Sequence, residues 1–200
     1  MYPLLIETIK CANGQCCNLA FHQSRFNFSR KQLFPKSANI SLTSEIKVPE
    51  FAQTGIFRCR VLYSSTIEKI EFLPYKKRTI TSLKLVADNT IDYRYKYADR
   101  KMLEALFEHR GSCDDILVVK NDCISDSFTA NPVFWDGQNW WTPDTPLLPG
   151  TQRAKLLDEQ KIKVCRISVN DLAKYQKVGL INAMQDLEHM PVLDIQQIVA

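Results

Sequence analysis

The chain has few of the residues and patterns that mark fibrous, disordered, secreted or membrane proteins. Only 6 of its 200 residues are Gly, and neither a repeat nor a low-complexity segment occurs, which argues against fibrous and disordered classes. No apolar run is long enough to span a membrane, and the first residues lack the basic lead of a signal peptide. With 45% hydrophobic residues, the sequence instead predicts a soluble globular protein of one large or two small domains.

Metal-binding residue types are scarce and poorly spaced. The sequence has 3 His, and its 7 Cys form no Cys-x-x-Cys pair. We therefore expect no metal site and no Cys–His nucleophile. The odd number of cysteines favours reduced thiols in a cytoplasmic protein.

The sequence also lacks a large excess of either charge sign, since its net charge is only +4. Residues 58–84 are locally basic and could form a nucleic-acid surface. However, Lys76-Lys77-Arg78 is typical of a solvated hairpin turn, and no aromatic-rich RNA-binding motif accompanies it. We expect no nucleic-acid partner.

The first 86 residues predict a small α+β domain. Residues 4–9 form a β-like run, 18–34 a candidate helix, and 55–63 and 67–72 two strands that could pair through the turn at 64–66. Residues 81–93 are expected to be the crossover into a second domain, which we place at 87–200.

The second domain is predicted to be mixed α/β. Alternation in 93–97 favours a strand, and a helix capped by Asp99 should follow it. Asp136-Gly137 predicts a hairpin between two strands that carry the tryptophans. The further expected elements are a buried strand at 115–119, a helix at 151–160, a strand at 162–167 and a helix at 169–175, capped by Asn170 or Asp171.

Two residues of this domain could carry chemistry. Lys96 lies between Arg94 and Arg100 and ahead of a helix, surroundings that disfavour the ammonium form and would suit an amine that attacks an aldehyde. A solvated surface lysine is the alternative. Asp126 could pair with a protonated ring nitrogen, although near Asn121 an Asp is also a common turn former.

Two turns could bind a phosphate. Gly150-Thr151 opens a predicted helix after a proline, where backbone N–H groups and a hydroxyl converge. Arg153 lies in the first turn of this helix, where the helix dipole disfavours a cation, so a bound anion nearby would stabilise it. A solvated Arg153 is the alternative. Asn182 ends a short apolar run and could donate to the same phosphate. A lysine, an acid and phosphate donors are together what pyridoxal phosphate requires.

The order of these motifs resembles the class IV aminotransferase family, the D-amino-acid-aminotransferase-like enzymes of fold type IV. The resemblance covers nearly the whole chain and implies a two-domain fold that binds pyridoxal phosphate. His22-Gln23-Ser24-Arg25 is similar to the family's His-x-x-Arg, which makes Arg25 a phosphate ligand. The cofactor-binding residues that the resemblance implies are Arg25, Lys96, Asp126, Asn131, Thr151, Gln152 and Asn182.

Within the family, Lys96-Tyr97-Ala98-Asp99-Arg100 is most similar to the Lys-x-x-Asn-Arg of aminodeoxychorismate lyases. The resemblance implies that Lys96 holds the cofactor and then removes a proton from the amine-bearing carbon of a small substrate. The lyase would release pyruvate from 4-amino-4-deoxychorismate and leave 4-aminobenzoate, a folate precursor. The family resemblance also implies a homodimer with each active site between the two domains.

Two alternatives stay open. One is a class IV aminotransferase that acts on a branched-chain or D-amino acid. The other is a non-catalytic family member, because Asp126 stands where the family usually has Glu and Pro132 follows Asn131.

Overall fold

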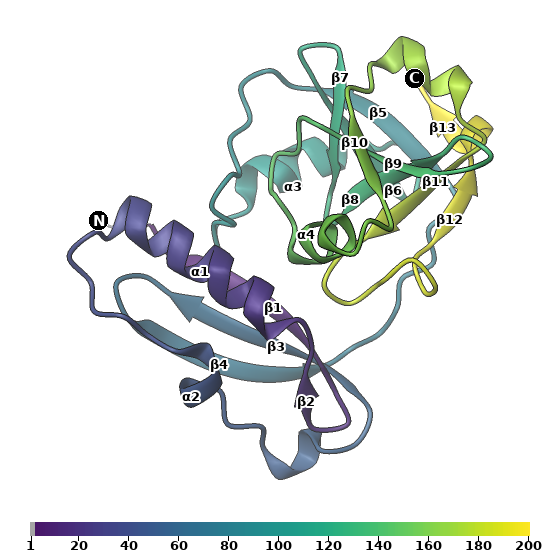
Figure 1. Ribbon diagram of the computed structural model, residues 1–200. Helices are drawn as coiled ribbons and strands as arrows, with labels where there is room; N and C mark the ends of the chain where they lie inside the picture. The colour runs from purple at the N-terminus through teal and green to yellow at the C-terminus, as the bar shows by residue number, and fades with distance from the viewer. Residues whose placement is uncertain (1–2) are drawn as a thin grey trace. The chain divides into compact units, whose positions relative to one another are not determined.

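The computed structural model describes residues 3–200, which divide into two compact units (Figure 1). The first unit comprises the chain up to Lys77 together with Tyr95–Asp99. The second comprises Arg78–Arg94 and Arg100–Ala200. Helices and strands are mixed in both units, so the α+β fold class predicted from the sequence is confirmed.

The first unit is built on an antiparallel sheet with the strand order β2-β1-β3-β4. Helix α1 lies along one face of this sheet (Figure 1). The elements of the unit are β1 (Leu5–Ala12), β2 (Gln15–Cys16), α1 (Leu19–Leu33), α2 (Leu42–Glu45), the 3-10 helix η1 (Glu50–Ala52), β3 (Ile56–Tyr63) and β4 (Ile67–Pro74).

The core of this unit follows from the alternation of β1. Leu5 and Ile9 are fully buried and pack with Phe26 of α1 and Tyr63 of β3, because alternate residues of a strand share one face. The predicted helix and the predicted pairing of 55–63 with 67–72 are confirmed.

The second unit contains two sheets. Their strand orders are β10-β9-β8-β11-β12 and β13-β5-β6-β7. The elements are β5 (Leu83–Ala87), α3 (Lys101–Glu108), β6 (Asp115–Lys120), β7 (Cys123–Ser127), β8 (Asn131–Trp135), β9 (Trp140–Pro143), α4 (Thr151–Asp158), β10 (Lys163–Cys165), η2 (Val169–Lys174), β11 (Lys177–Ile181), β12 (Val192–Asp194), η3 (Ile195–Gln197) and β13 (Ile198–Val199).

Both sheets contribute to one core. Ile124 of β7 and Leu117 of β6 pack in the same cluster as Phe134 and Val178, so the two sheets of this unit bury their apolar faces together. The hairpin predicted at Asp136-Gly137 is confirmed, and Gly137 adopts the positive φ of 104° that such a turn favours.

The domain boundary differs from the one predicted at residue 86. The division falls after Lys77, because residues 83–87 are not a crossover but strand β5, which pairs in parallel with β6. The chain then returns to the first unit at Tyr95–Asp99. Lys96 therefore groups with the small unit and not with the second domain, where the sequence analysis had placed it.

Three local predictions were also wrong. Residues 93–97 are not a strand: Arg94 and Tyr95 form a turn, and only Tyr97 bridges to Leu5. The N-cap of α3 is Arg100 instead of Asp99. The segment Val169–Lys174 is a 3-10 helix whose cap is Ser168, with the side chain of Asp171 completing a capping box.

No helix among residues 3–200 is both long and apolar enough to cross a membrane.

Candidate active site

A buried carboxylate lies at the centre of the small unit. Glu7 occupies the same face of β1 as Leu5 and Ile9, and it is fully buried beneath α1. Arg25 of α1 donates to it twice, from Nε to Oε1 at 2.9 Å and from Nη2 to Oε2 at 2.6 Å. Nδ1 of His22, one helical turn earlier, lies 2.6 Å from Oε2. Residues three apart on a helix share a face, which is why both side chains reach one carboxylate.

The charges of this cluster follow from burial and pairing. Burial is the largest influence on the pKa of Glu7 and would raise it, but the positive charge of Arg25 and the hydrogen bonds from His22 and Arg25 outweigh burial. The pKa of Glu7 is lowered from 4.5 to about 2. Burial lowers the pKa of His22 in spite of Glu7, so the imidazole is neutral at pH 7. Because an ionised carboxylate only accepts, Nδ1 of His22 carries the proton and donates it.

Lys96 is fixed by its backbone against the same strand. Its carbonyl accepts a hydrogen bond from Ile6 N at 3.1 Å, and Ala98 N donates to Leu4 O at 2.8 Å. Lys96 has a φ of 54°, in the left-handed region that side-chain-bearing residues rarely adopt. The positive charges of Arg25 and Lys96 both lower the pKa of His22. Arg25 and Lys96 therefore both act on the charge of one histidine.

In the second unit, Asp126 lies inside strand β7 and not in a turn. Its carboxylate is buried and accepts two hydrogen bonds, at Oδ1 from Asn131 Nδ2 at 2.8 Å and at Oδ2 from Leu148 N at 2.9 Å. Burial raises its pKa from 3.8 to about 7, although Leu148 N, the Asn131 amide and the charge of Arg153 act in the opposite direction. A positive partner beside this carboxylate would favour its ionised form.

Asn131 connects the acid to the start of α4. Besides its bond to Asp126, Nδ2 donates to Leu148 O at 2.9 Å. Gly150, the N-cap of α4, approaches so closely that a Cβ there would lie 2.1 Å from Asn131 Oδ1. Glycine at this position is therefore required by contact with Asn131.

Thr151 and Gln152 are the first two residues of α4, and both are buried. Backbone N–H groups in the first turn of a helix have no partner within the helix and face any anion at that end. Arg153 turns elsewhere: its Nε donates to Thr142 Oγ1 at 3.2 Å and its Nη2 to Pro143 O at 2.9 Å. Arg153 is thus partly buried, and these two bonds link α4 to β9.

Asn182 lies just after β11 in a tight turn. Its Oδ1 accepts from Met184 N at 2.9 Å, and its Nδ2 lies 3.4 Å from Thr129 O. Thr129 belongs to the loop that joins the strand of Asp126 to the strand of Asn131. Asn182 therefore contacts the connection between these two residues.

The sequence analysis missed Glu7. A usable signal was present, because Glu7 is the one charged residue in the run from residue 4 to 9, and His22 and Arg25 are spaced to share a helix face. An acid in such a strand needs a buried partner, and the helix offers two.

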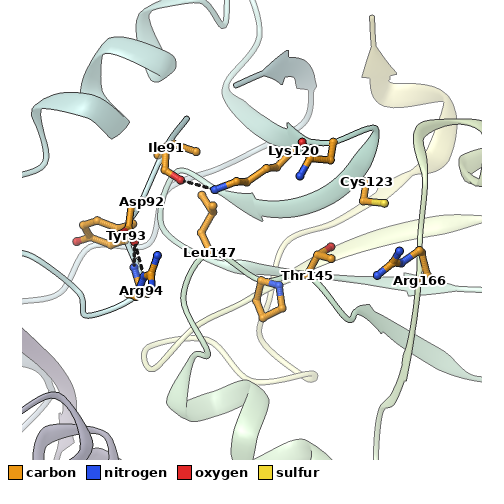
Figure 2. A pocket seen from close by; sticks show the side chains of 11 residues that line it. Ile91, Asp92, Tyr93, Arg94, Lys120, Cys123, Thr145, Leu147 and Arg166 are labelled. Atoms are coloured by element: carbon orange, nitrogen blue, oxygen red, sulfur yellow. Dashed lines mark hydrogen bonds and ion pairs between the residues drawn. The ribbon is translucent and has the colours of Figure 1, made fainter. Parts of the chain in front are cut away.

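A separate pocket of about 360 Å³ lies in the second unit (Figure 2). Lys120 Nζ donates to Ile91 O at 2.7 Å on one side of it, and Arg94 Nε donates to Asp92 Oδ1 at 3.0 Å on another. The lining includes Leu147 but none of the seven predicted cofactor residues. The basic side chains of this pocket are thus already engaged by neighbouring oxygens of the protein.

The sequence model of one protein family matches nearly the whole chain. The sequence model of the family Amino-transferase class IV matches residues 4–195, and the protein belongs to this family. An uncharacterized protein from Haemophilus influenzae is 38% identical over 189 residues, which cover 94% of this chain and all of that protein.

Solved structures agree with this assignment. A proposed 4-amino-4-deoxychorismate lyase from Haemophilus somnus superposes with a TM-score of 0.88 at 35% identity, covering 94% of this chain and 98% of that one. The pyridoxal-phosphate-bound form of a hypothetical aminotransferase from Mycobacterium tuberculosis gives a TM-score of 0.71 at 15% identity, covering 96% of this chain and 80% of that one. The second likeness shows the fold alone.

The residues present fit pyridoxal phosphate. Asp126 is a buried carboxyl group whose pKa burial raises, and a protonated ring nitrogen beside it would favour its ionised form; a glycine-capped helix start suits a phosphate. In the small unit, Lys96 carries a primary amine on a backbone in a strained conformation, which suits the aldehyde of this cofactor.

Proposed function

We propose that this protein is a pyridoxal-phosphate-dependent lyase that eliminates pyruvate from 4-amino-4-deoxychorismate and leaves 4-aminobenzoate. The observation that carries the proposal is the cluster of Asp126, Asn131 and Gly150, in which a buried acid, its orienting amide and a phosphate-binding helix start are joined by direct contacts. The likeness to the proposed lyase from Haemophilus somnus supports the choice of reaction.

In this proposal each group of residues has one task. When bound, pyridoxal phosphate supplies an electron sink for the carbon that bears the substrate amine. Lys96 would hold the cofactor through its Nζ and would serve as the base for the proton on that carbon. Asp126 would keep the ring nitrogen protonated. Asn131 holds the Asp126 carboxylate in place by donating from Nδ2 to its Oδ1.

The phosphate is assigned to the N-terminal turn of α4, with the backbone of Thr151 and Gln152, and to Asn182 and Arg25. Since Glu7 already accepts from Nε and Nη2 of Arg25, a phosphate contact would have to use Nη1 or the second hydrogen of Nη2. Glu7 acts in this proposal as a positioning residue, because it sets the orientation of the guanidinium without touching the cofactor.

The φ of 54° at Lys96 supports its role. Strained backbone conformations of this kind cost free energy and are concentrated at functional sites, where the surrounding structure enforces them. Here the enforcing contacts are the hydrogen bonds from Ile6 N and Ala98 N.

The first test is spectroscopic. The purified protein is mixed with pyridoxal phosphate, its near-visible absorption is recorded, and the adduct is reduced with borohydride before peptide mapping. A new absorption band and a label on Lys96 are the expected results. No band, or a label on another lysine, would favour the non-catalytic alternative.

The second test separates the two reactions. The loaded protein is incubated with 4-amino-4-deoxychorismate without any keto acid, and 4-aminobenzoate is measured. The lyase forms product under these conditions. Product formation that depends strictly on an added keto acid would favour the aminotransferase.

The homodimer that the family resemblance implies is also part of the proposal. Light scattering on the protein as it elutes from a size-exclusion column tests it.

A further inference from the structure

Four of the seven cysteines lie near one end of the small unit, apart from the residues assigned to the cofactor. Cys11 belongs to β1, Cys16 to β2 and Cys59 to β3, and Cys17 follows β2 directly. Cys11 and Cys59 are fully buried, whereas Cys16 is partly exposed. Strand pairing places Cys16 beside Cys11, and the side chains of both Cys11 and Cys59 influence the pKa of Cys16. Three thiols therefore interact, and of these only Cys16 has access to solvent.

Cys11 and Cys16 are direct cross-strand partners in the β1–β2 hairpin. Its two-residue turn is Asn13-Gly14, with positive φ at both positions. Cys17 N donates to Lys10 O at 2.7 Å, so the neighbouring pair is a hydrogen-bonded one. Because the two kinds of pair alternate, Cys11 and Cys16 form a non-hydrogen-bonded pair, in which Cα atoms are about 4.5 Å apart and the side chains approach most closely.

This separation falls within the range of about 4.4–6.8 Å that a disulfide spans. Cys59 does not meet the same condition. It lies on β3, on the far side of β1 from Cys16 and opposite Ile9 instead of Cys11, so two strand spacings alone place the Cα atoms at least roughly 9.5 Å apart. Cys59 can share a hydrogen bond with Cys16, but it cannot be linked to Cys16 without movement of the backbone.

We propose that Cys16 is an oxidant-reactive thiol whose sulfur attacks hydrogen peroxide, and that Cys11 resolves the product into a disulfide across the hairpin. In the first step the Cys16 sulfur bonds to one peroxide oxygen, the O–O bond breaks, and a sulfenic acid and one water result. In the second step the Cys11 sulfur attacks the Cys16 sulfur and displaces the hydroxyl group as water. Two thiols and one hydrogen peroxide thus give one disulfide and two waters.

The local electrostatics favour the first step. The hydrogen bond with Cys59 is the largest influence on the pKa of Cys16, and together with the bond from Cys11 it outweighs burial and lowers this pKa to about 7. Burial, followed by the charge of Cys16 and the hydrogen bond with it, raises the pKa of Cys11 to about 11. The thiolate is the nucleophilic form, so the exposed cysteine reacts first and the buried one follows.

Digestion with trypsin gives a direct test, because cleavage after Lys10 and Arg25 leaves Cys11, Cys16 and Cys17 in one peptide. The full-length protein is treated with one equivalent of hydrogen peroxide, the remaining thiols are blocked, and the peptide is analysed without reduction. We expect this peptide to lose two hydrogens, to carry one blocked thiol, at Cys17, and to regain the two hydrogens with dithiothreitol.

Three variants assign the linkage. Cys17→Ser should form the disulfide as the unaltered protein does, and Cys16→Ser should not form it. Cys11→Ser should instead accumulate the sulfenic acid at Cys16, trapped by dimedone. Circular dichroism of each variant confirms folding, and Cys11→Ala replaces Cys11→Ser if the hydroxyl prevents folding. The proposal is overturned if the peptide keeps its mass, if a linkage joins Cys17 or Cys59, or if Cys17→Ser abolishes the reaction.

Discussion

Arg25 and Glu7 form a bidentate ion pair inside the small unit, with the guanidinium Nε and Nη2 donating to the two carboxylate oxygens at 2.9 and 2.6 Å. The pair ties helix α1 to strand β1, and the same carboxylate binds His22. Buried pairs of this kind resist the loss of one partner, because the remaining charge is left without compensation.

Glu7→Gln should lower the free energy of unfolding of the small unit by about 3–5 kcal/mol, since Arg25 would remain buried opposite a neutral amide. Amide hydrogen exchange of β1 measures the effect. The matched control is Glu71→Gln, which removes a half-exposed pair with Arg60 and should cost at most about 1 kcal/mol. Equal effects of the two substitutions would contradict the central role of Glu7.

The pKa of Glu7 also predicts an acid transition. A carboxyl group whose pKa falls from 4.5 when unfolded to about 2 when folded stabilises the protein fully above pH 4.5, and this stability is lost as the pH falls toward 2. The difference of about 2.5 pKa units corresponds to about 3 kcal/mol. Hydrogen exchange of β1 at pH 6, 4 and 3 should show the loss, and Glu7→Gln should flatten this part of the curve.

The raised pKa of Asp126 predicts the opposite dependence on pH, so the second unit should become less stable as the pH rises. Its pKa is raised from 3.8 to about 7, so its contribution to stability is fully present below pH 3.8 and is lost as the pH rises through 7. The shift of roughly three units corresponds to about 4 kcal/mol. All three tryptophans lie in this unit, so their fluorescence in urea reports its unfolding. Asp126→Asn should remove the slope between pH 4 and 7, and an unchanged slope would show that another group titrates there.

Gly150→Ala should disrupt the contact between α4 and Asn131. A Cβ at this position would lie 2.1 Å from Asn131 Oδ1, so Asn131 would have to move and lose its bonds to Asp126 and Leu148. We expect a loss of about 1–3 kcal/mol and weaker binding of pyridoxal phosphate, measured by fluorescence titration.

Gly111→Ala is the control for Gly150→Ala. Its Cβ would have open space, so this variant should show only the cost of its φ of 59°, about 1 kcal/mol. Its affinity for the cofactor should not change. Equal affinities of both variants and the unaltered protein would rule out a role of the Gly150 contact in cofactor binding.

Lys96→Ala should abolish turnover, because no other amine is assigned to hold the cofactor or move the proton. Alanine also carries a Cβ, so it accepts the φ of 54° no worse than lysine does, and the fold should be retained. The control is Lys101→Ala in α3, which should keep both the absorption band and turnover. Rates in Lys96→Ala equal to those of the unaltered protein would refute the proposed mechanism.

The sequence by itself determined the elements whose signals are local. The helix Leu19–Leu33 and the hairpins β3–β4 and β8–β9 follow from periodicity and turn residues, which act over a few positions. The order of the motifs also sufficed to predict the family, since it needs only residue types and spacing.

Only the tertiary structure decided where Asp126, Lys96 and Glu7 lie. Asp126 is in a strand instead of a turn because β7 pairs with β6 and buries it, and Lys96 leaves the extended conformation because its carbonyl accepts from Ile6 N, 90 positions earlier. Glu7 meets Arg25 only when α1 packs on the sheet. Such contacts join segments far apart in the chain, and the energy of burying a group depends on its partners, which no local pattern specifies.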